Sequence, residues 1–233
     1  MLVPPPPMAT RSSKWRYSWL MLVVAGFLAL AEWKGWLPKD GTGAGQRGPV
    51  VLRKPQRPGK PGAQGTHKIG AWEELHGCIL VEDRSNDGDS FVVRHEGGDH
   101  TLRIYFADCP EKHRHQYNGP RIAGQGQYFG GLTEEETVAV GGDARDFSLA
   151  LLREGPFTIL TRWEPVFDSG RFYAFVTVGE RDLGERLVEQ GLARIYTKGE
   201  NRPGGITVAA EKRRLQGMEQ DARRANRGAW GKR

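Results

Sequence analysis

The chain has 233 residues, with 34 Lys and Arg against 28 Asp and Glu, a formal net charge of +6 and a pI near 9.4. Its 38% hydrophobic and 27% charged residues exclude a collagen-like chain, a wholly disordered chain and a membrane protein with several spans. With only two cysteines, Cys78 and Cys109, the chain is not a disulfide-rich scaffold. It also lacks the CxxC pairs that are typical of a zinc ribbon. A single bridge between these two cysteines stays open if the chain is exported.

Residues 1–37 have the pattern of an export segment, in which a short basic stretch precedes an apolar run at residues 19–31. An apolar helix of this length covers roughly 20 Å of the ~30 Å core of a bilayer, so a membrane anchor needs residues 17–37. A small-x-small pattern ending at Ala31 is typical of signal-peptide cleavage. Anchor and cleaved signal remain alternatives, and both predict a folded part outside the cytoplasm.

Residues 38–70 contain eight Gly and five Pro and almost no large apolar side chain, which predicts a disordered linker. This segment carries a net charge of +6 and residues 1–37 carry +3, which leaves residues 71–233 with −3. The basic excess therefore lies outside the predicted folded domain, 71–233, so the pI alone does not indicate a nucleic-acid-binding domain.

The predicted folded domain alternates strand and helix signals. Five strands are predicted from β-branched and aromatic runs between turn formers, at residues 79–82, 91–94, 101–106, 157–163 and 171–178. Three helices are predicted from apolar spacing and capping residues, at 143–154, 182–191 and from 207 onward. A long loop is expected over residues 112–142. Five strands with a helix between the third and the fourth predict an α+β, mainly β fold, a five-stranded OB-type Greek-key barrel with about three helices.

Charged side chains gather at the predicted strand ends and turns. Asp89 and Asp108 supply carboxylates that suit a hard cation, and the nearby Glu111 can take a proton from a water molecule. Arg103 and Arg171 supply guanidinium groups that can hold a phosphate through two hydrogen bonds. Together these residue types predict metal-assisted phosphodiester hydrolysis.

The same residues, in this order, resemble the staphylococcal nuclease (thermonuclease) family over about residues 73–230. The motifs that carry the resemblance are Asp87-Gly88-Asp89-Ser90, residues 103–111, Gly170-Arg171 and residues 187–193. The resemblance implies a nuclease of the thermonuclease type that cleaves DNA and/or RNA and uses Ca²⁺.

The resemblance also implies a metal site and a base. Asp89 and Asp108 match the calcium-binding aspartates of the family, and the backbone carbonyl of Cys109 matches the main-chain oxygen that completes the site. Glu111 matches the catalytic glutamate, which is proposed as the general base.

Substrate contacts are implied in the same way. Arg103 and Arg171 match the two phosphate-binding arginines, which also serve catalysis. Tyr196 matches a family tyrosine near the nucleotide if a gap of one residue is allowed. The Lys-Tyr pair that precedes Gly-Arg in the best-known member is replaced here by Asp168 and Ser169.

Two further expectations concern the whole molecule. We expect a monomer whose partners are DNA and/or RNA, with a membrane contact through residues 17–37 if the apolar segment is not cleaved. The alternative function is a non-catalytic module at the cell surface that binds nucleic acid or protein.

Overall fold

The computed structural model describes residues 65–232, which all lie in one compact unit of the chain. The predicted export segment and most of the predicted linker lie outside the described residues. Within residues 65–232, no helix is long and apolar enough to cross a membrane.

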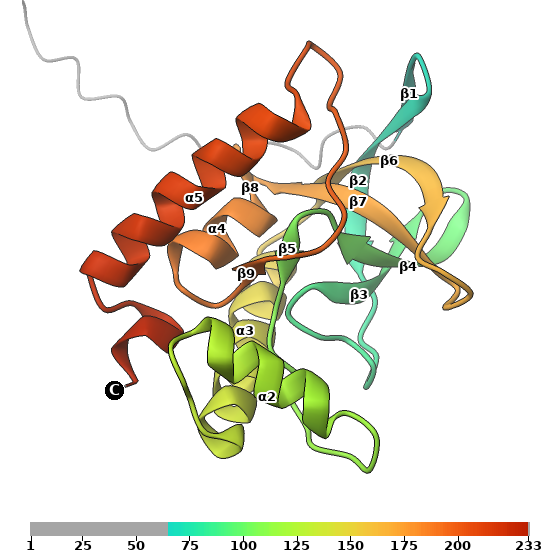
Figure 1. The fold of residues 1–233 in the computed structure, drawn as a ribbon. Coiled ribbons are helices and arrows are strands. Elements are labelled where there is room, and N and C mark those ends of the chain that lie inside the picture. The colour runs from blue at the N-terminus through green and yellow to red at the C-terminus, as the bar shows by residue number, and fades with distance from the viewer. Residues whose placement is uncertain (1–64, 233) are drawn as a thin grey trace, which may run out of the picture. The chain divides into compact units, whose positions relative to one another are not determined.

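Five strands close into a barrel (Figure 1). They are β2 (Trp72–Leu80), β3 (Ser90–His95), β4 (Gly98–Ile104), β6 (Phe157–Pro165) and β7 (Arg171–Val178). The strands are paired in the order β2-β3-β4-β7-β6, and β6 pairs with β2 to close the circle. The β4–β7 pair is parallel, whereas the other four pairs of the barrel are antiparallel. The predicted five-stranded OB-type barrel is thus confirmed.

Two short strands extend the sheet of the barrel, and two others form a separate two-stranded sheet. β1 (Gly65–Ile69) pairs with β2 and lies within the range that the sequence assigns to the linker. β8 (Arg181–Asp182) pairs with β7. β5 (Ala107–Asp108) pairs with β9 (Arg194–Ile195), which places Asp108 opposite Arg194.

The described residues form four α-helices instead of the predicted three, followed by a short 3₁₀ helix. They are α2 (Gly119–Tyr128), α3 (Glu134–Arg153), α4 (Leu183–Glu189), α5 (Val208–Arg224) and η1 (Gly228–Gly231). α3 begins at Glu134 instead of Asp143, because Thr133 and Glu136 form a capping box there. Helices α4 and α5 begin after Asp182 and Thr207, as predicted, and each of these side chains accepts a backbone N–H bond.

Helix α2 occupies part of the segment that was predicted as a loop. One of its glycines serves close packing: a Cβ on Gly126 would lie 2.5 Å from the carbonyl oxygen of Leu132 and 2.7 Å from Oγ1 of Thr137. Pro120 stands in the first turn, where its missing N–H would have no helical partner. Residues 112–142 therefore contain a helix although their glycine content favours a loop.

The end of β4 holds a neighbouring loop in place. Phe106 has a φ of +63° and turns the chain from β4 into β5, and its side chain is buried in the core. Its N–H donates to the carbonyl of Lys198 (2.9 Å), and its own carbonyl accepts from the N–H groups of Tyr196 (2.8 Å) and Thr197 (3.2 Å). The segment after β9 is thereby fixed beside the residues that follow β4.

Candidate active site

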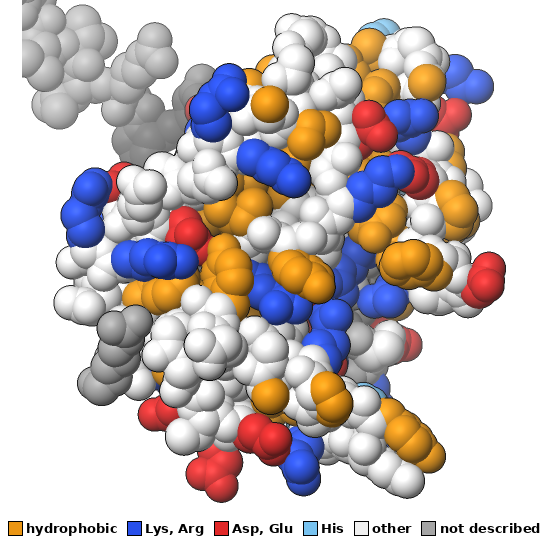
Figure 2. Space-filling view, in the orientation of Figure 1, with side chains coloured by type: hydrophobic (Ala, Val, Ile, Leu, Met, Phe, Trp, Pro, Cys, Tyr) orange, Lys and Arg blue, Asp and Glu red, His pale blue; other side chains and the backbone are white. Residues whose placement is uncertain are grey.

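A hollow of about 690 Å³ opens beside the ends of β4 and β7. Five of the seven predicted site residues line it: Arg103, Asp108, Glu111, Arg171 and Tyr196. Figure 2 shows Lys and Arg side chains gathered in and around a hollow near the middle of this face, beside hydrophobic side chains. The other two predicted site residues, Asp89 and Cys109, are buried next to the five that line the hollow.

Strand register brings the predicted residues together. Asp89 directly precedes β3, and its neighbour Ser90 pairs with Arg103 of β4. Arg171 begins β7 and pairs with Thr101, two residues before Arg103 on β4. Residues far apart in the chain thus occupy adjacent strands at one end of the barrel.

Arg103 joins the two aspartates. Its Nη1 lies 3.0 Å from Oδ1 of Asp89, and its Nη2 forms a short bond with Oδ1 of Asp108. Burial opposes the charge of this guanidinium, but the two carboxylates outweigh that effect and raise the pKa of Arg103. Arg103 is therefore a buried, permanently charged bridge between the predicted metal ligands.

The two aspartates have different electrostatic environments. Burial raises the pKa of Asp89, and Arg103 is the nearest opposing charge. Burial acts on Asp108 in the same direction, but Arg103, Arg121 and Arg194 together hold its pKa below the ordinary value. Asp108 is consequently the carboxylate that stays ionised most readily.

Gln125 of α2 holds the segment between Asp108 and Glu111. Its Nε2 donates to the carbonyl oxygen of Cys109 (3.0 Å), and its Oε1 accepts from the N–H of Glu111 (3.1 Å). The N–H of Cys109 donates in turn to Oδ2 of Asp89 (2.6 Å). These bonds connect α2, the site segment and β3.

Both cysteines are buried and have free thiols, so the bridge that the sequence left open is not formed. Burial raises the pKa of the Cys109 thiol well above its ordinary value and that of Cys78 to about 12. The side chain of Cys109 therefore acts as an apolar group, and only its backbone takes part in the site.

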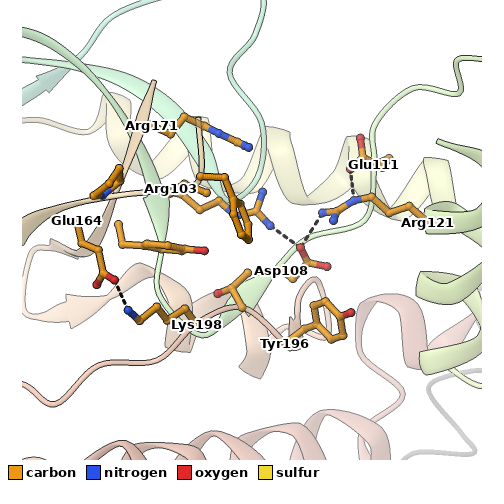
Figure 3. A pocket seen from close by; sticks show the side chains of 13 residues that line it. Arg103, Asp108, Glu111, Arg121, Glu164, Arg171, Tyr196 and Lys198 are labelled. Atoms are coloured by element: carbon orange, nitrogen blue, oxygen red, sulfur yellow. Dashed lines mark hydrogen bonds and ion pairs between the residues drawn. The ribbon is translucent and has the colours of Figure 1, made fainter. Parts of the chain in front are cut away.

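Asp108 accepts hydrogen bonds on both oxygens, and Figure 3 shows the bonds that Arg103 and Arg121 donate. Arg103 and Arg121 donate to Oδ1, and the Arg121 contact measures 2.8 Å. Arg194 (2.6 Å) and Gln125 (3.3 Å) donate to Oδ2. A carboxylate has about four acceptor positions, so these four donors fill them.

The sequence does not by itself indicate three site residues, Arg121, Gln125 and Arg194. Arg194 directly follows the motif at residues 187–193, and its place on β9 opposite Asp108 is a tertiary relationship. Arg121 and Gln125 are four residues apart, which places them on one face of a helix, but that helix was not predicted.

Glu111 and Arg171 face the same hollow and differ in their partners. Oε1 of Glu111 lies 2.5 Å from Nε of Arg121. Arg171 donates to Oγ of Ser90 (3.2 Å) and Oγ of Ser169 (3.1 Å), and within residues 65–232 no carboxylate pairs with it. Burial and the neighbouring Arg103 lower the pKa of Arg171. Its charge is therefore open to an anion.

Tyr196 stands at the rim of the hollow. Its side chain is 65% exposed, and the guanidinium of Arg194 lies 3.8 Å from its ring centroid. Phe167, between β6 and β7, also lines the hollow and is 88% exposed. Two aromatic surfaces thus border the space beside the arginines.

The predicted metal ligands fit calcium in chemical type. Two carboxylates, from Asp89 and Asp108, and the carbonyl of Cys109 are hard oxygen donors held together by Arg103 and by the Cys109–Asp89 bond. Among residues 65–232, no group of three or more His, Cys, Asp or Glu side chains is arranged to hold a metal. A cation here would rely on these three protein oxygens, and Asp108 would have to release one of its N–H donors.

The barrel thus places buried carboxylates and arginines around one hollow. A family model described as staphylococcal nuclease homologue matches residues 101–232. The chain belongs to this family, whose nucleases generally depend on calcium. The match begins inside β4, so Asp89 precedes it. No curated protein matches the chain.

Proposed function

We propose that this chain is a calcium-dependent nuclease that hydrolyses phosphodiester bonds of DNA and/or RNA. The observation that carries the proposal is the meeting of Asp108, Glu111 and Arg171 in one hollow. Membership of the staphylococcal nuclease homologue family supports the same class of reaction.

The geometry supports a separate role for each residue. Arg171 binds the scissile phosphate, because its guanidinium has only hydroxyl partners in the described part of the chain. Glu111 takes the proton of the attacking water through Oε2, since its ion pair with Arg121 uses Oε1. Arg103 holds Asp89 and Asp108 at a fixed separation and offsets charge on the phosphate.

Asp89, Asp108 and the Cys109 carbonyl would hold the calcium ion. When bound, the ion supplies positive charge to a phosphate oxygen and lowers the pKa of a coordinated water.

We also propose that the nuclease acts outside the cytoplasm, either anchored through residues 17–37 or released by cleavage after Ala31. The support is the basic stretch followed by an apolar run in the N-terminal sequence. Sizing the mature protein and sequencing its N-terminus distinguish the two forms, because cleavage makes Glu32 the first residue.

The experiment for the nuclease is digestion of plasmid DNA and of RNA with added calcium. Glu111→Gln and Arg171→Ala should each lower the rate by roughly 10²-fold or more, because each removes a group that acts on the reacting phosphate. Matched controls are Glu82→Gln and Arg153→Ala, which pair with each other (2.7 Å) away from the hollow and should keep full activity. Unchanged rates in Glu111→Gln and Arg171→Ala would show that the site is assigned wrongly. Full activity in the presence of chelator would show that the reaction does not depend on calcium.

The second candidate is a non-catalytic module that binds nucleic acid. The observation in its favour is that Arg121 already pairs with Glu111 and Asp108, which neutralises groups that catalysis needs. This function predicts oligonucleotide binding with no cleavage at any calcium concentration, so the same digestion assay decides between the two.

A further inference from the structure

Helix α2 brings a guanidinium into the site that the motifs of the family resemblance do not include. Arg121, in the first turn of α2, points at two carboxylates (Figure 3). Its Nη2 lies 2.8 Å from Oδ1 of Asp108, and its Nε lies 2.5 Å from Oε1 of Glu111. The residue therefore touches one predicted metal ligand and the predicted base.

Arg121 differs in exposure from the other arginines on Asp108. The side chains of Arg103 and Arg194 are 11% and 8% exposed, so both are enclosed by the barrel and β9. The side chain of Arg121 is 39% exposed and lines the hollow. Breaking an ion pair costs less when water can solvate the released guanidinium, so of these three arginines Arg121 can exchange partners at the lowest cost.

The charges of the site favour an anion. Three carboxylates line the hollow, from Asp108, Glu111 and Glu164. Four cationic groups line it with them, from Arg103, Arg121, Arg171 and Lys198. The lining has one positive charge in excess, and one phosphodiester carries one negative charge.

Arg121 and Arg171 are suited to share that anion. Both line the same hollow as Arg103, and among the described residues the partners of Arg171 are the hydroxyl groups of Ser90 and Ser169. An oxyanion placed between two such guanidiniums relieves their repulsion and accepts charge-assisted hydrogen bonds from both.

We propose that Arg121 of α2 is a ligand for the substrate phosphate. Asp108 and Glu111 hold its guanidinium in the free protein, and Arg121 binds the phosphate together with Arg171 without needing a divalent cation. The proposal rests on the proposed function, since it names a further phosphate contact of that site. It also gives the helix inserted between Glu111 and α3 a direct role in binding substrate.

The test measures binding of thymidine 5′-monophosphate to the full chain by titration calorimetry in excess chelator. This probe has a phosphate and no phosphodiester bond, so cleavage cannot affect the result. Wild-type protein should bind, Arg121→Gln should bind at least about tenfold more weakly, and Arg121→Lys should lie between them because it keeps the charge and loses the planar fork.

Arg114→Gln is the matched control. Arg114 belongs to the same inserted segment and pairs with Glu134 (2.7 Å) on the exposed surface, so its loss should leave binding unchanged. Thermal unfolding of all variants identifies any loss of fold, and the Lys variant keeps the test valid if the Gln variant is unstable. Binding by folded Arg121→Gln within twofold of wild type overturns the proposal, as does a wild type that binds only with a divalent cation.

The digestion assay with Glu111→Gln separates this proposal from the proposed function. If phosphate binding depends on Arg121 but the protein never cleaves DNA or RNA, the role of Arg121 as a phosphate ligand stands and the nuclease function is rejected. If cleavage depends on Glu111 but phosphate binding does not depend on Arg121, the nuclease function stands and the ligand role of Arg121 is rejected.

Discussion

The side-chain amide of Gln125 donates a 3.0 Å hydrogen bond to the backbone carbonyl of Cys109. Gln125 is fully buried, and the same side chain accepts from the N–H of Glu111. One residue of α2 therefore sets the path of the main chain between the predicted metal ligand and the predicted base.

Replacing Gln125 by Ala should lower both stability and activity. Its removal leaves the Cys109 carbonyl and the Glu111 N–H without these partners, which costs about 1–3 kcal/mol for a buried unsatisfied group. The free energy of unfolding in urea measures the first effect, and the digestion rate well below the unfolding temperature measures the second. Gln127→Ala, an exposed position on the same helix, should stay within about 0.5 kcal/mol of wild type. Equal stabilities for the two variants would contradict the positioning role.

Two adjacent glycines of α3 should respond in opposite ways to Ala. A Cβ on Gly141 would lie 2.6 Å from the carbonyl oxygen of Pro110 and closer still to that of Glu111, so Ala must displace the segment that bears the predicted base. A Cβ on Gly142 would meet nothing within 4 Å. Gly141→Ala should lose roughly 1–3 kcal/mol and most activity, as overpacked sites do. Gly142→Ala should gain up to about 1 kcal/mol from helix propensity and keep its activity. Urea unfolding and the digestion assay, applied to both variants, check this pair.

Removing Arg121 should strengthen calcium binding. Four N–H donors fill the acceptor positions of Asp108, and the donor from Arg121 is the one that solvent reaches most readily. Arg121→Gln frees one acceptor position on Oδ1 of Asp108 and removes a positive charge beside the ion, so calcium should bind about threefold to tenfold more tightly, or roughly 0.7–1.4 kcal/mol. Calcium titration calorimetry measures the change, with Arg114→Gln as the unaffected control. A weaker affinity in Arg121→Gln would mean that Arg121 does not compete for Asp108.

A buried aspartate that does not line the hollow predicts a pH effect on stability. Asp182 caps α4 through the N–H of Glu185 (3.0 Å) and pairs with Arg202 (3.1 Å); Arg214 and Glu211 lie in the same cluster. Burial raises the pKa of Asp182 in spite of Arg202. The folded state then binds the Asp182 proton more tightly than the unfolded state, and this difference adds to the free energy of unfolding. The added stability is complete below the unfolded pKa of about 3.9 and is lost as the pH rises through the folded-state pKa.

Asp182→Asn isolates that contribution, because Asn keeps the cap and cannot titrate. The free energy of unfolding of wild type, relative to the Asn variant, should fall between pH 3.5 and pH 7. Urea unfolding of both proteins at several pH values measures the difference. A constant difference over this range would show that Asp182 titrates alike in the folded and unfolded states.

The sequence by itself determined the succession of five barrel strands along the chain, although it placed the first at 79–82 and the structure has it at Trp72–Leu80. It also determined the capped starts of α4 and α5 and the succession of carboxylates and arginines. These features depend on local patterns: β-branched runs between turns, and Asp182 and Thr207 accepting N–H bonds from residues three positions ahead. Such patterns depend only on residues close together in the chain, so they can be recognised without knowing the fold.

Only the tertiary structure decided what surrounds Asp108. Its partners Arg121, Gln125 and Arg194 lie 13, 17 and 86 residues away in the chain. The pairing of β9 with β5 in a separate two-stranded sheet brings Arg194 to Asp108, and the packing of Gly126 in α2 against Leu132 and Thr137 brings Arg121 and Gln125. The charge state of a buried carboxylate depends on the groups that the fold places around it, and no local pattern specifies those groups.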